Sequence, residues 1–301
     1  MTYEDLPCYF EALPGYFKAF EEKDSLGIDS TIQDPTEFAS HTSWEDLYHS
    51  IPSDTEKYHY KLLILARHGQ GYHNAALARY GLAQWEGHWS MLEGDEYGSW
   101  VDSRLTPVGK KQVQATGEEL FSPIVKSLGS FPHIFFSSPM RRCLETFVGS
   151  WTPNLAEHKE LARDAVIPVN IIEELRETLG EHYCDKRVPH SELIEEYQDF
   201  KTTSGHTIQW IFEANYPEHD TLWLPNVRES VGDMDQRVCK GLLKMFNHVQ
   251  PHQKIVSLTC HSGVIHSTLR NLRHPRVNFL NTGGIVCAVV QLDIDKINTF
   301  K

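Results

Sequence analysis

Two histidines in the sequence lie where a short predicted strand ends, and a glycine follows each of them closely. Arg67 and His68 end the run that begins at residue 62, and His261 lies just past the run 254–259. A neutral imidazole can attack phosphorus to form a covalent phosphohistidine, and a second histidine can stabilise charge on the phosphoryl group during its transfer. Arg67 and Arg142 can hold a phosphate in forked geometry, so this chemistry needs no metal ion.

A carboxylic acid completes this chemistry, because the leaving oxygen of a phosphate ester must take up a proton. Glu177 is the candidate, at the end of the stretch 173–177, which follows the apolar run 166–170. Glu174 lies in the same stretch and is the alternative proton donor. His73 follows the turn after His68 and is expected at the surface.

Short apolar runs alternate with helical patterns along most of the chain. Apolar runs without alternation indicate strands that are buried on both faces. We predict strands at 60–66, 133–137, 166–170, 254–259 and 285–292, and helices at 74–85, 106–126, 229–249 and 264–272 and after Pro139. This order predicts an α/β fold, a three-layer αβα sandwich with a mostly parallel central sheet. Ligands bind at the carboxyl ends of parallel strands, so His68 and His261 are expected at one edge of the sheet.

Three other segments differ from this alternating pattern. Residues 1–58 carry many aromatic side chains without clear periodicity, so we expect an N-terminal extension that packs on a main domain of residues 59–301. Residues 182–227 are rich in His, Pro and Trp without a regular period, and we expect an insertion that forms a cap. Residues 86–104 are expected to form a loop near the site, with several acids and Arg104 as its one basic residue besides histidine.

Charge and cysteine content narrow the class of partner and the compartment. The 301 residues carry a formal net charge of −13, which disfavours nucleic acid and anionic membranes as partners, because both bind basic surfaces. No apolar run approaches the length of a membrane span, and no secretory leader is expected. The six cysteines form no CxxC pair, which favours a reducing compartment, the cytoplasm or the nucleus.

Four motifs, in this order, resemble those of the histidine phosphatase superfamily, in its phosphoglycerate mutase-like branch 1. They are LARHG at 65–69 with Asn74, LTPVG at 105–109 with Gln112, SSPMRR at 137–142 with Thr146, and CHSGVI at 260–265. The resemblance covers roughly residues 60–292 and is closest to fungal phosphomutase-like proteins, through PGYF at 14–17 and LRE at 175–177.

The resemblance implies roles for particular residues. His68, Glu177 and His261 would be catalytic, while Arg67, Asn74 and Arg142 would bind the substrate phosphate. The spacing of the third motif selects Arg142 over Arg141. One departure concerns Gly71, since the family usually has serine there, and this removes a hydroxyl donor near the phosphate.

The function predicted from these residues is metal-independent hydrolysis of a small phosphomonoester through a phosphohistidine on His68. No metal and no cofactor are expected. A phosphoglycerate mutase-type phosphomutase is the alternative, and a weakly active regulatory or binding protein on the same fold is a third hypothesis. The physiological substrate and the oligomeric state are left open.

Overall fold

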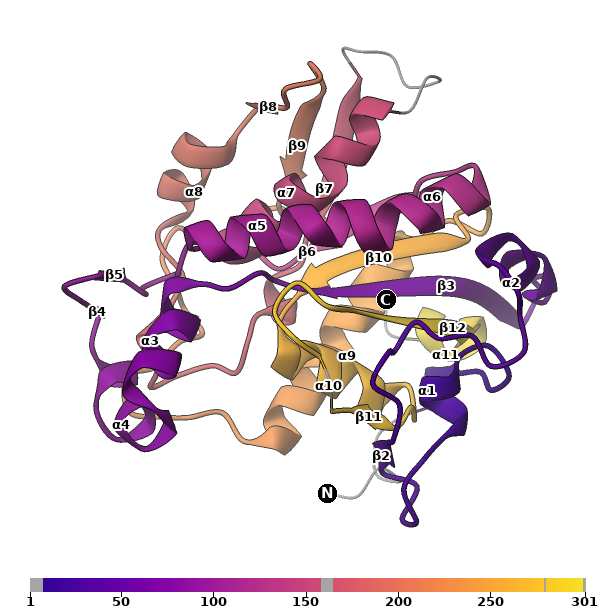
Figure 1. Cartoon of the computed structure of the whole chain (residues 1–301), viewed down its shortest axis with the longest axis horizontal. Coiled ribbons are helices and arrows are strands. Elements are labelled where there is room, and N and C mark those ends of the chain that lie inside the picture. The colour runs from indigo at the N-terminus through magenta and orange to yellow at the C-terminus, as the bar shows by residue number, and fades with distance from the viewer. Residues whose placement is uncertain (1–7, 158–164, 279, 300–301) are drawn as a thin grey trace.

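The computed structural model describes residues 8–157, 165–278 and 280–299, so the first seven residues of the expected extension lie outside it. Eight strands in the described part form one sheet, in the order β1-β12-β3-β10-β6-β7-β9-β8 (Figure 1). The five strands from β3 to β9 in this order are parallel, while β12, β1 and β8 join by antiparallel pairing. The strands are β1 (Phe10–Ala12), β12 (Ile285–Asp293), β3 (Tyr58–Arg67), β10 (Ile255–Cys260), β6 (Ile134–Ser137), β7 (Val166–Ile171), β9 (Thr207–Ile211) and β8 (Phe200–Lys201).

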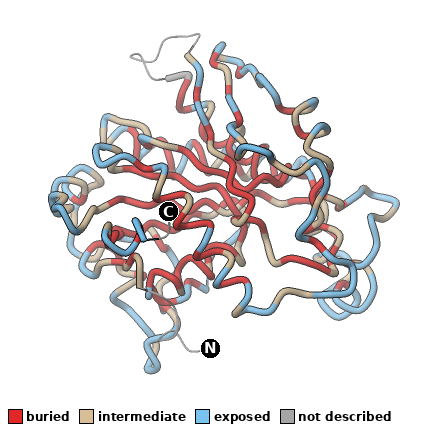
Figure 2. The backbone as a smooth tube through the Cα atoms, turned by 180° about the vertical axis from the view of Figure 1, so that it is seen from behind, coloured by how far each residue is buried: buried red, intermediate tan, exposed pale blue. Residues whose placement is uncertain are grey.

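Helices cover both faces of the sheet, which confirms the predicted α/β sandwich with its mostly parallel sheet. One face packs on α6 (Ser122–Leu128) and α7 (Arg141–Glu157), and the other on α9 (Val231–His248) and α10 (Ser262–Asn271). Successive side chains of β3 alternate between the two cores: Leu62 and Ile64 join the first, Leu63 and Leu65 the second. Burying one such side chain contributes about 1.5–3 kcal/mol. The central strands are accordingly buried along most of their length (Figure 2).

The register of the central strands brings the chemistry-bearing residues to one level. In the parallel ladder Arg67 lies opposite Cys260, and Thr259 lies opposite Ser137. The N–H of His68 donates to the carbonyl of Cys260 at 3.0 Å. His68, His261 and Ser138 therefore leave the sheet side by side at its carboxyl edge.

The N-terminal segment packs against the sheet and the C-terminal part of the chain. β1 pairs with β12, and β2 (Asp29–Ser30) pairs with β11 (Arg276–Val277). Asp29 also forms an ion pair of 2.8 Å with Arg276. This segment further contains α1 (Lys18–Glu21) and α2 (Trp44–Ser50), and α2 packs against α6.

Some elements differ from the sequence-based prediction. The helix expected at 74–85 is two helices, α3 (Tyr72–Tyr80) and α4 (Leu82–Gly87), because Gly81 between them has φ of 76°. The helix expected at 106–126 is α5 (Pro107–Ala115), a π-helical turn η3 (Thr116–Phe121) and α6 in succession. The loop near the site contains η2 (Trp89–Met91) and a small hairpin, β4 (Gly94–Asp95) and β5 (Gly98–Ser99).

The segment 182–227 is more regular than its composition indicated. It contains η5 (Tyr183–Asp185), α8 (His190–Tyr197), β8 and β9, and β9 extends the central sheet by pairing with β7. The remaining elements are η4 (Glu173–Leu175) and α11 (Ile294–Asn298). In the described part of the chain, no helix combines the length and the apolar composition that crossing a membrane requires.

Candidate active site

His68 follows β3 and is almost fully buried. Its Nδ1 lies 2.7 Å from the carbonyl oxygen of Gly69, and because a carbonyl only accepts, Nδ1 must carry the proton. Nε2 therefore keeps a free lone pair. Burial, with the charges of Arg142 and Arg67, holds the pKa of His68 well below its ordinary value, so the ring is neutral at neutral pH.

His261 lies beside His68, with 5.2 Å between the centres of the two rings. Its Nδ1 accepts a hydrogen bond of 3.2 Å from Nε of Arg142, since a guanidinium only donates. Nε2 then carries the proton and donates to the hydroxyl of Ser138 at 2.8 Å. Burial and the charge of Arg142 hold the pKa of His261 well below its ordinary value, so this ring is also neutral.

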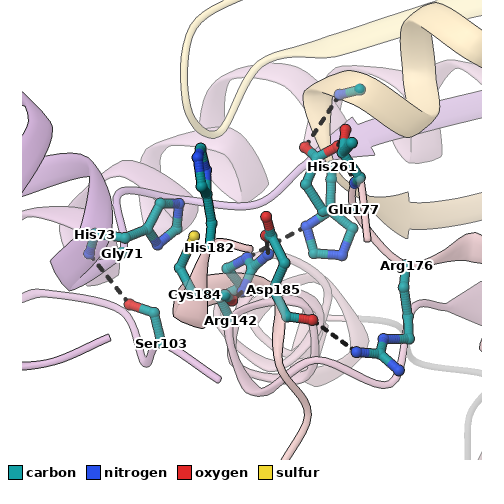
Figure 3. A network of polar contacts seen from close by, with 12 residues as sticks. Gly71, His73, Ser103, Arg142, Arg176, Glu177, His182, Cys184, Asp185 and His261 are labelled. Atoms are coloured by element: carbon teal, nitrogen blue, oxygen red, sulfur yellow. Dashed lines mark hydrogen bonds and ion pairs between the residues drawn. The ribbon is translucent and has the colours of Figure 1, made fainter. Parts of the chain in front are cut away.

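Arg142 lies at the centre of the site and is fully buried (Figure 3). It donates to the carbonyl of Cys184 at 2.7 Å and forms an ion pair of 3.2 Å with Asp185. Its neighbour Arg141 points elsewhere and pairs with Glu192 and Glu196 of α8. The structure thus brings Arg142, and not Arg141, to the two histidines.

Arg67 lies at the end of β3 and donates to the carbonyl of Leu280 at 2.7 Å. Its buried Nε has no hydrogen-bond partner among the described residues, so the guanidinium keeps unused donor capacity. Burial lowers the pKa of Arg67, while the nearby charge of Glu177 raises it. The guanidinium stays charged at any ordinary pH.

Glu177 lies against the first turn of α10. Its carboxylate accepts the N–H of Gly263 at 3.1 Å and the N–H of Thr178 at 2.9 Å. A Cβ at position 263 would lie 2.0 Å from Oε1 of Glu177, so only glycine allows this approach. The alternative acid, Glu174, instead forms an ion pair with Lys244 of α9. Of the two acids, Glu177 is the one with an electrostatic contact to Arg67.

Asn74 and His73 follow the glycines after His68. The Oδ1 of Asn74 accepts the N–H of Gly71 at 2.9 Å and closes the first turn of α3. Its role toward phosphate stays a prediction. His73 is partly exposed, but its ring lies toward the site, since its centre is 5.6 Å from that of His68 and its Nδ1 is buried.

Sequence reasoning missed Asp185 and Arg228 in this site. Asp185 is buried and bridges two cations, with one oxygen on Arg142 and the other on Arg228 at 2.9 Å. Arg228 also donates to the carbonyls of Thr178 and Gly180, so it ties the segment after Glu177 to the bridge. No local pattern distinguishes these two residues in the sequence, because their partners lie far along the chain.

His182, Cys184 and Asp185 form the one cluster of metal-type ligands within the described residues, with ligand atoms that lie within 4.8 Å of one another. Both oxygens of Asp185 are already paired with guanidinium groups. Burial also raises the pKa of the Cys184 thiol well above its ordinary value, so the thiolate form that binds metals is disfavoured. The charge and protonation of this cluster do not fit a divalent cation.

The two histidines lie at one carboxyl edge of the sheet, as the ends of the predicted parallel strands indicated. Residues 63–298 match the family model of the histidine phosphatase superfamily (branch 1), and the chain belongs to this superfamily. Membership supports an enzyme of the phosphatase or mutase type.

Individual relatives agree with this membership. A probable phosphoglycerate mutase of Saccharomyces cerevisiae, PMU1, is 56% identical over 94% of this chain and 96% of its own length. Phosphomutase-like protein 3 of Candida albicans is 30% identical over 94% of this chain and 82% of its own. The predicted resemblance to fungal phosphomutase-like proteins is thereby confirmed. Among solved structures, a mycobacterial glucosyl-3-phosphoglycerate phosphatase aligns with 75% of this chain and 88% of its own, at 18% identity and a TM-score of 0.38.

Proposed function

We propose that the protein hydrolyses small phosphomonoesters without a metal ion, through a phosphohistidine on His68. The state of His68 is the observation that supports this most. Its Nδ1 proton is held by the carbonyl of Gly69, so Nε2 can attack phosphorus without first losing a proton. Arg67 and Arg142 lie close enough to lower the pKa of His68, and two such cations favour a bound dianionic phosphate.

The proposed reaction has two steps. First, Nε2 of His68 bonds to phosphorus as the ester P–O bond breaks, and the leaving oxygen takes a proton from the acid form of Glu177. Then water attacks the phosphohistidine, gives a proton to the Glu177 carboxylate and releases inorganic phosphate. Arg142 stabilises negative charge on the phosphoryl oxygens in both steps, and the Nε2–H of His261 does so once it exchanges the Ser138 hydroxyl for a phosphoryl oxygen.

The surroundings of the site favour a substrate whose remainder is neutral or cationic. Arg104, which belongs to the loop near the site, is engaged by Glu145 at 3.3 Å and by Glu196. Arg79 is paired with Asp95 of the same loop. Lys186 lies over aromatic rings, 5.2 Å from the centre of one of them. A second acidic group of a substrate would therefore meet few uncompensated cations here, which favours hydrolysis over a mutase reaction on bisphosphates.

A phosphomutase is the second candidate, because the relatives include a probable phosphoglycerate mutase and a phosphomutase-like protein. A mutase would have to protect the phosphohistidine from water until the acceptor hydroxyl arrives. The two reactions differ in their products. With candidate monophosphates and bisphosphates we expect free phosphate to exceed isomerised product, and the opposite ratio, or a need for a bisphosphate primer, would establish the mutase.

The proposed mechanism is tested first at His68. We expect His68→Ala to lose all measurable hydrolysis of p-nitrophenyl phosphate while its melting temperature stays close to that of the unsubstituted protein. The matched control is His248→Ala, since His248 is exposed on α9 and lies outside the site. Radioactive phosphate from a labelled substrate should be trapped on the protein after rapid quenching, and not on His68→Ala.

Chelation of metal ions with EDTA is a second test of the proposed mechanism. Turnover should survive EDTA, because Arg67, Arg142 and His261 supply the positive charge and hydrogen bonds that a metal would otherwise supply. Loss of activity in EDTA, followed by recovery with a divalent cation, would refute the metal-independent mechanism.

A further inference from the structure

A third histidine, His73, has its ring beside His68, and the proposed mechanism assigns it no role. The ring centre of His73 is 5.6 Å from that of His68. Arg142 and Arg67 both act electrostatically on it, as they do on His68. Figure 3 shows the ring extending from the start of α3 toward the side where His182 and Arg142 lie.

The orientation of this ring follows from its contact with Gly71. A Cβ at position 71 would lie 2.8 Å from Nδ1 and 2.9 Å from Cε1 of His73. The edge of the ring that carries Nδ1 and Cε1 is therefore packed against the backbone of Gly71. Any side chain at position 71 would therefore push the ring out of place.

The buried Nδ1 also indicates where the proton of the neutral ring resides. Nδ1 has no hydrogen-bond partner among the described residues. An orphaned buried N–H is rarer in proteins than an orphaned acceptor, so the proton belongs on Nε2. Burial and the nearby cations hold the pKa of His73 well below its ordinary value, which keeps the ring neutral with Nε2–H as a donor.

We propose that His73 is a substrate-binding residue whose Nε2–H donates a hydrogen bond to a non-bridging oxygen of the phosphoryl group. This proposal rests on the proposed function and deepens it. The ring fills the space that a side chain at position 71 would occupy, and it supplies an N–H donor on that side of the phosphoryl group. Gly71 and His73 then act as a pair, since the missing side chain makes room for the ring.

Binding of inorganic phosphate tests the proposal directly, by calorimetry and by competitive inhibition of p-nitrophenyl phosphate hydrolysis. His73→Phe keeps a ring but removes both nitrogens, and we expect phosphate to bind on the order of 10-fold more weakly. His73→Gln restores a donor and should bind phosphate more tightly than His73→Phe. The matched control is His274→Phe, because the His274 ring packs on Phe20 away from the site, and this variant should bind phosphate as the unsubstituted protein does.

A second perturbation leaves the imidazole in the chain and moves it. Gly71→Ala should weaken phosphate binding because the new methyl group displaces the ring, whereas Gly87→Ala should not, since a Cβ at 87 meets no atom within 4 Å. Unchanged phosphate binding in His73→Phe, or equal binding in His73→Phe and His73→Gln, would overturn the proposal. If the unsubstituted protein neither binds phosphate nor hydrolyses the ester, the proposed function itself fails, and the two failures are thereby distinguished.

Discussion

At the scale of single residues, backbone and side-chain partners fix which nitrogen of each ring carries the proton. The carbonyl of Gly69 keeps the proton of His68 on Nδ1, while Nε of Arg142 keeps the proton of His261 on Nε2. One ring thus presents a lone pair and the other an N–H group. Burial, aided by the charge of Arg142 at both rings and of Arg67 at His68, keeps both rings neutral, so the arginines that would hold a phosphate also favour the nucleophilic form of His68.

Glu177 gives a prediction at this scale, because a general acid matters most when the leaving group is poor. Glu177→Gln should reduce kcat on an alkyl phosphate by on the order of 10²-fold or more. The reduction on p-nitrophenyl phosphate should be much smaller, since that leaving group needs no proton. The control is Glu174→Gln, which removes the partner of Lys244 and should leave the ratio of the two rates unchanged. Equal losses on both substrates would mean that Glu177 has a structural role.

At the scale of elements, the start of α10 must approach Glu177 closely. Gly263 is the second residue of that helix, and a Cβ there would lie 2.0 Å from Oε1 of Glu177. We expect Gly263→Ala to displace the carboxylate and to reduce kcat on an alkyl phosphate by about 10- to 100-fold. The melting temperature should change little, because alanine favours a helix more than glycine does.

The chain offers a matched control for this substitution. Gly232 is also the second residue of a helix, α9, and a Cβ there meets only the hydroxyl of Ser230 at 4.0 Å. Gly232→Ala should therefore keep full activity. If Gly263→Ala is as active as Gly232→Ala on the alkyl phosphate, the position of Glu177 is not critical for the reaction.

Elements with a strong local pattern were predicted well from the sequence. The predicted strand at 60–66 is β3, residues 58–67, which contains the apolar run 62–66, and the predicted strand at 254–259 is β10, residues 255–260. The helix at 106–126 was predicted from Thr106 and Pro107, and the Thr106 side chain does accept the N–H of Gly109.

Contacts between distant segments could not be predicted in the same way. β9 is a short strand with one face exposed, and it was missed within an irregular composition. Asp185 has importance only because Arg142 and Arg228 meet it in the fold. His73 was placed at the surface because nothing in its sequence neighbourhood shows that its ring lies beside His68.

At the scale of the whole molecule, buried histidines couple stability to pH. His274 packs edge-on against Phe20, and burial, with a smaller contribution from Lys23, lowers its pKa from 6.5 to about 4. In the unfolded chain this ring takes up a proton near pH 6.5, and in the folded protein it does not until about pH 4. The unfolded state therefore binds more protons in this window, and stability falls as the pH falls.

The expected slope from His274 alone is about 1 kcal/mol per pH unit between roughly pH 6 and 4.5. Other buried groups add to it, so the measurement compares variants. Urea unfolding at several pH values should give a shallower dependence for His274→Phe than for the unsubstituted protein, by about that amount per pH unit. Parallel curves for the two proteins would show that this ring titrates similarly in both states.

The position of β3 in the sheet has a consequence for how the chain is made. Both neighbours of β3 come late in the sequence, since Leu62 pairs with Ile255 on one side and with Val289 on the other. While the ribosome is still producing the middle of the chain, this apolar strand has two open edges and no sheet to join. The nascent protein therefore carries an aggregation-prone segment through most of its synthesis, and only the emergence of its last portion can protect it. A release of the chain before Ile285 would leave the edge of β3 that pairs with β12 permanently exposed.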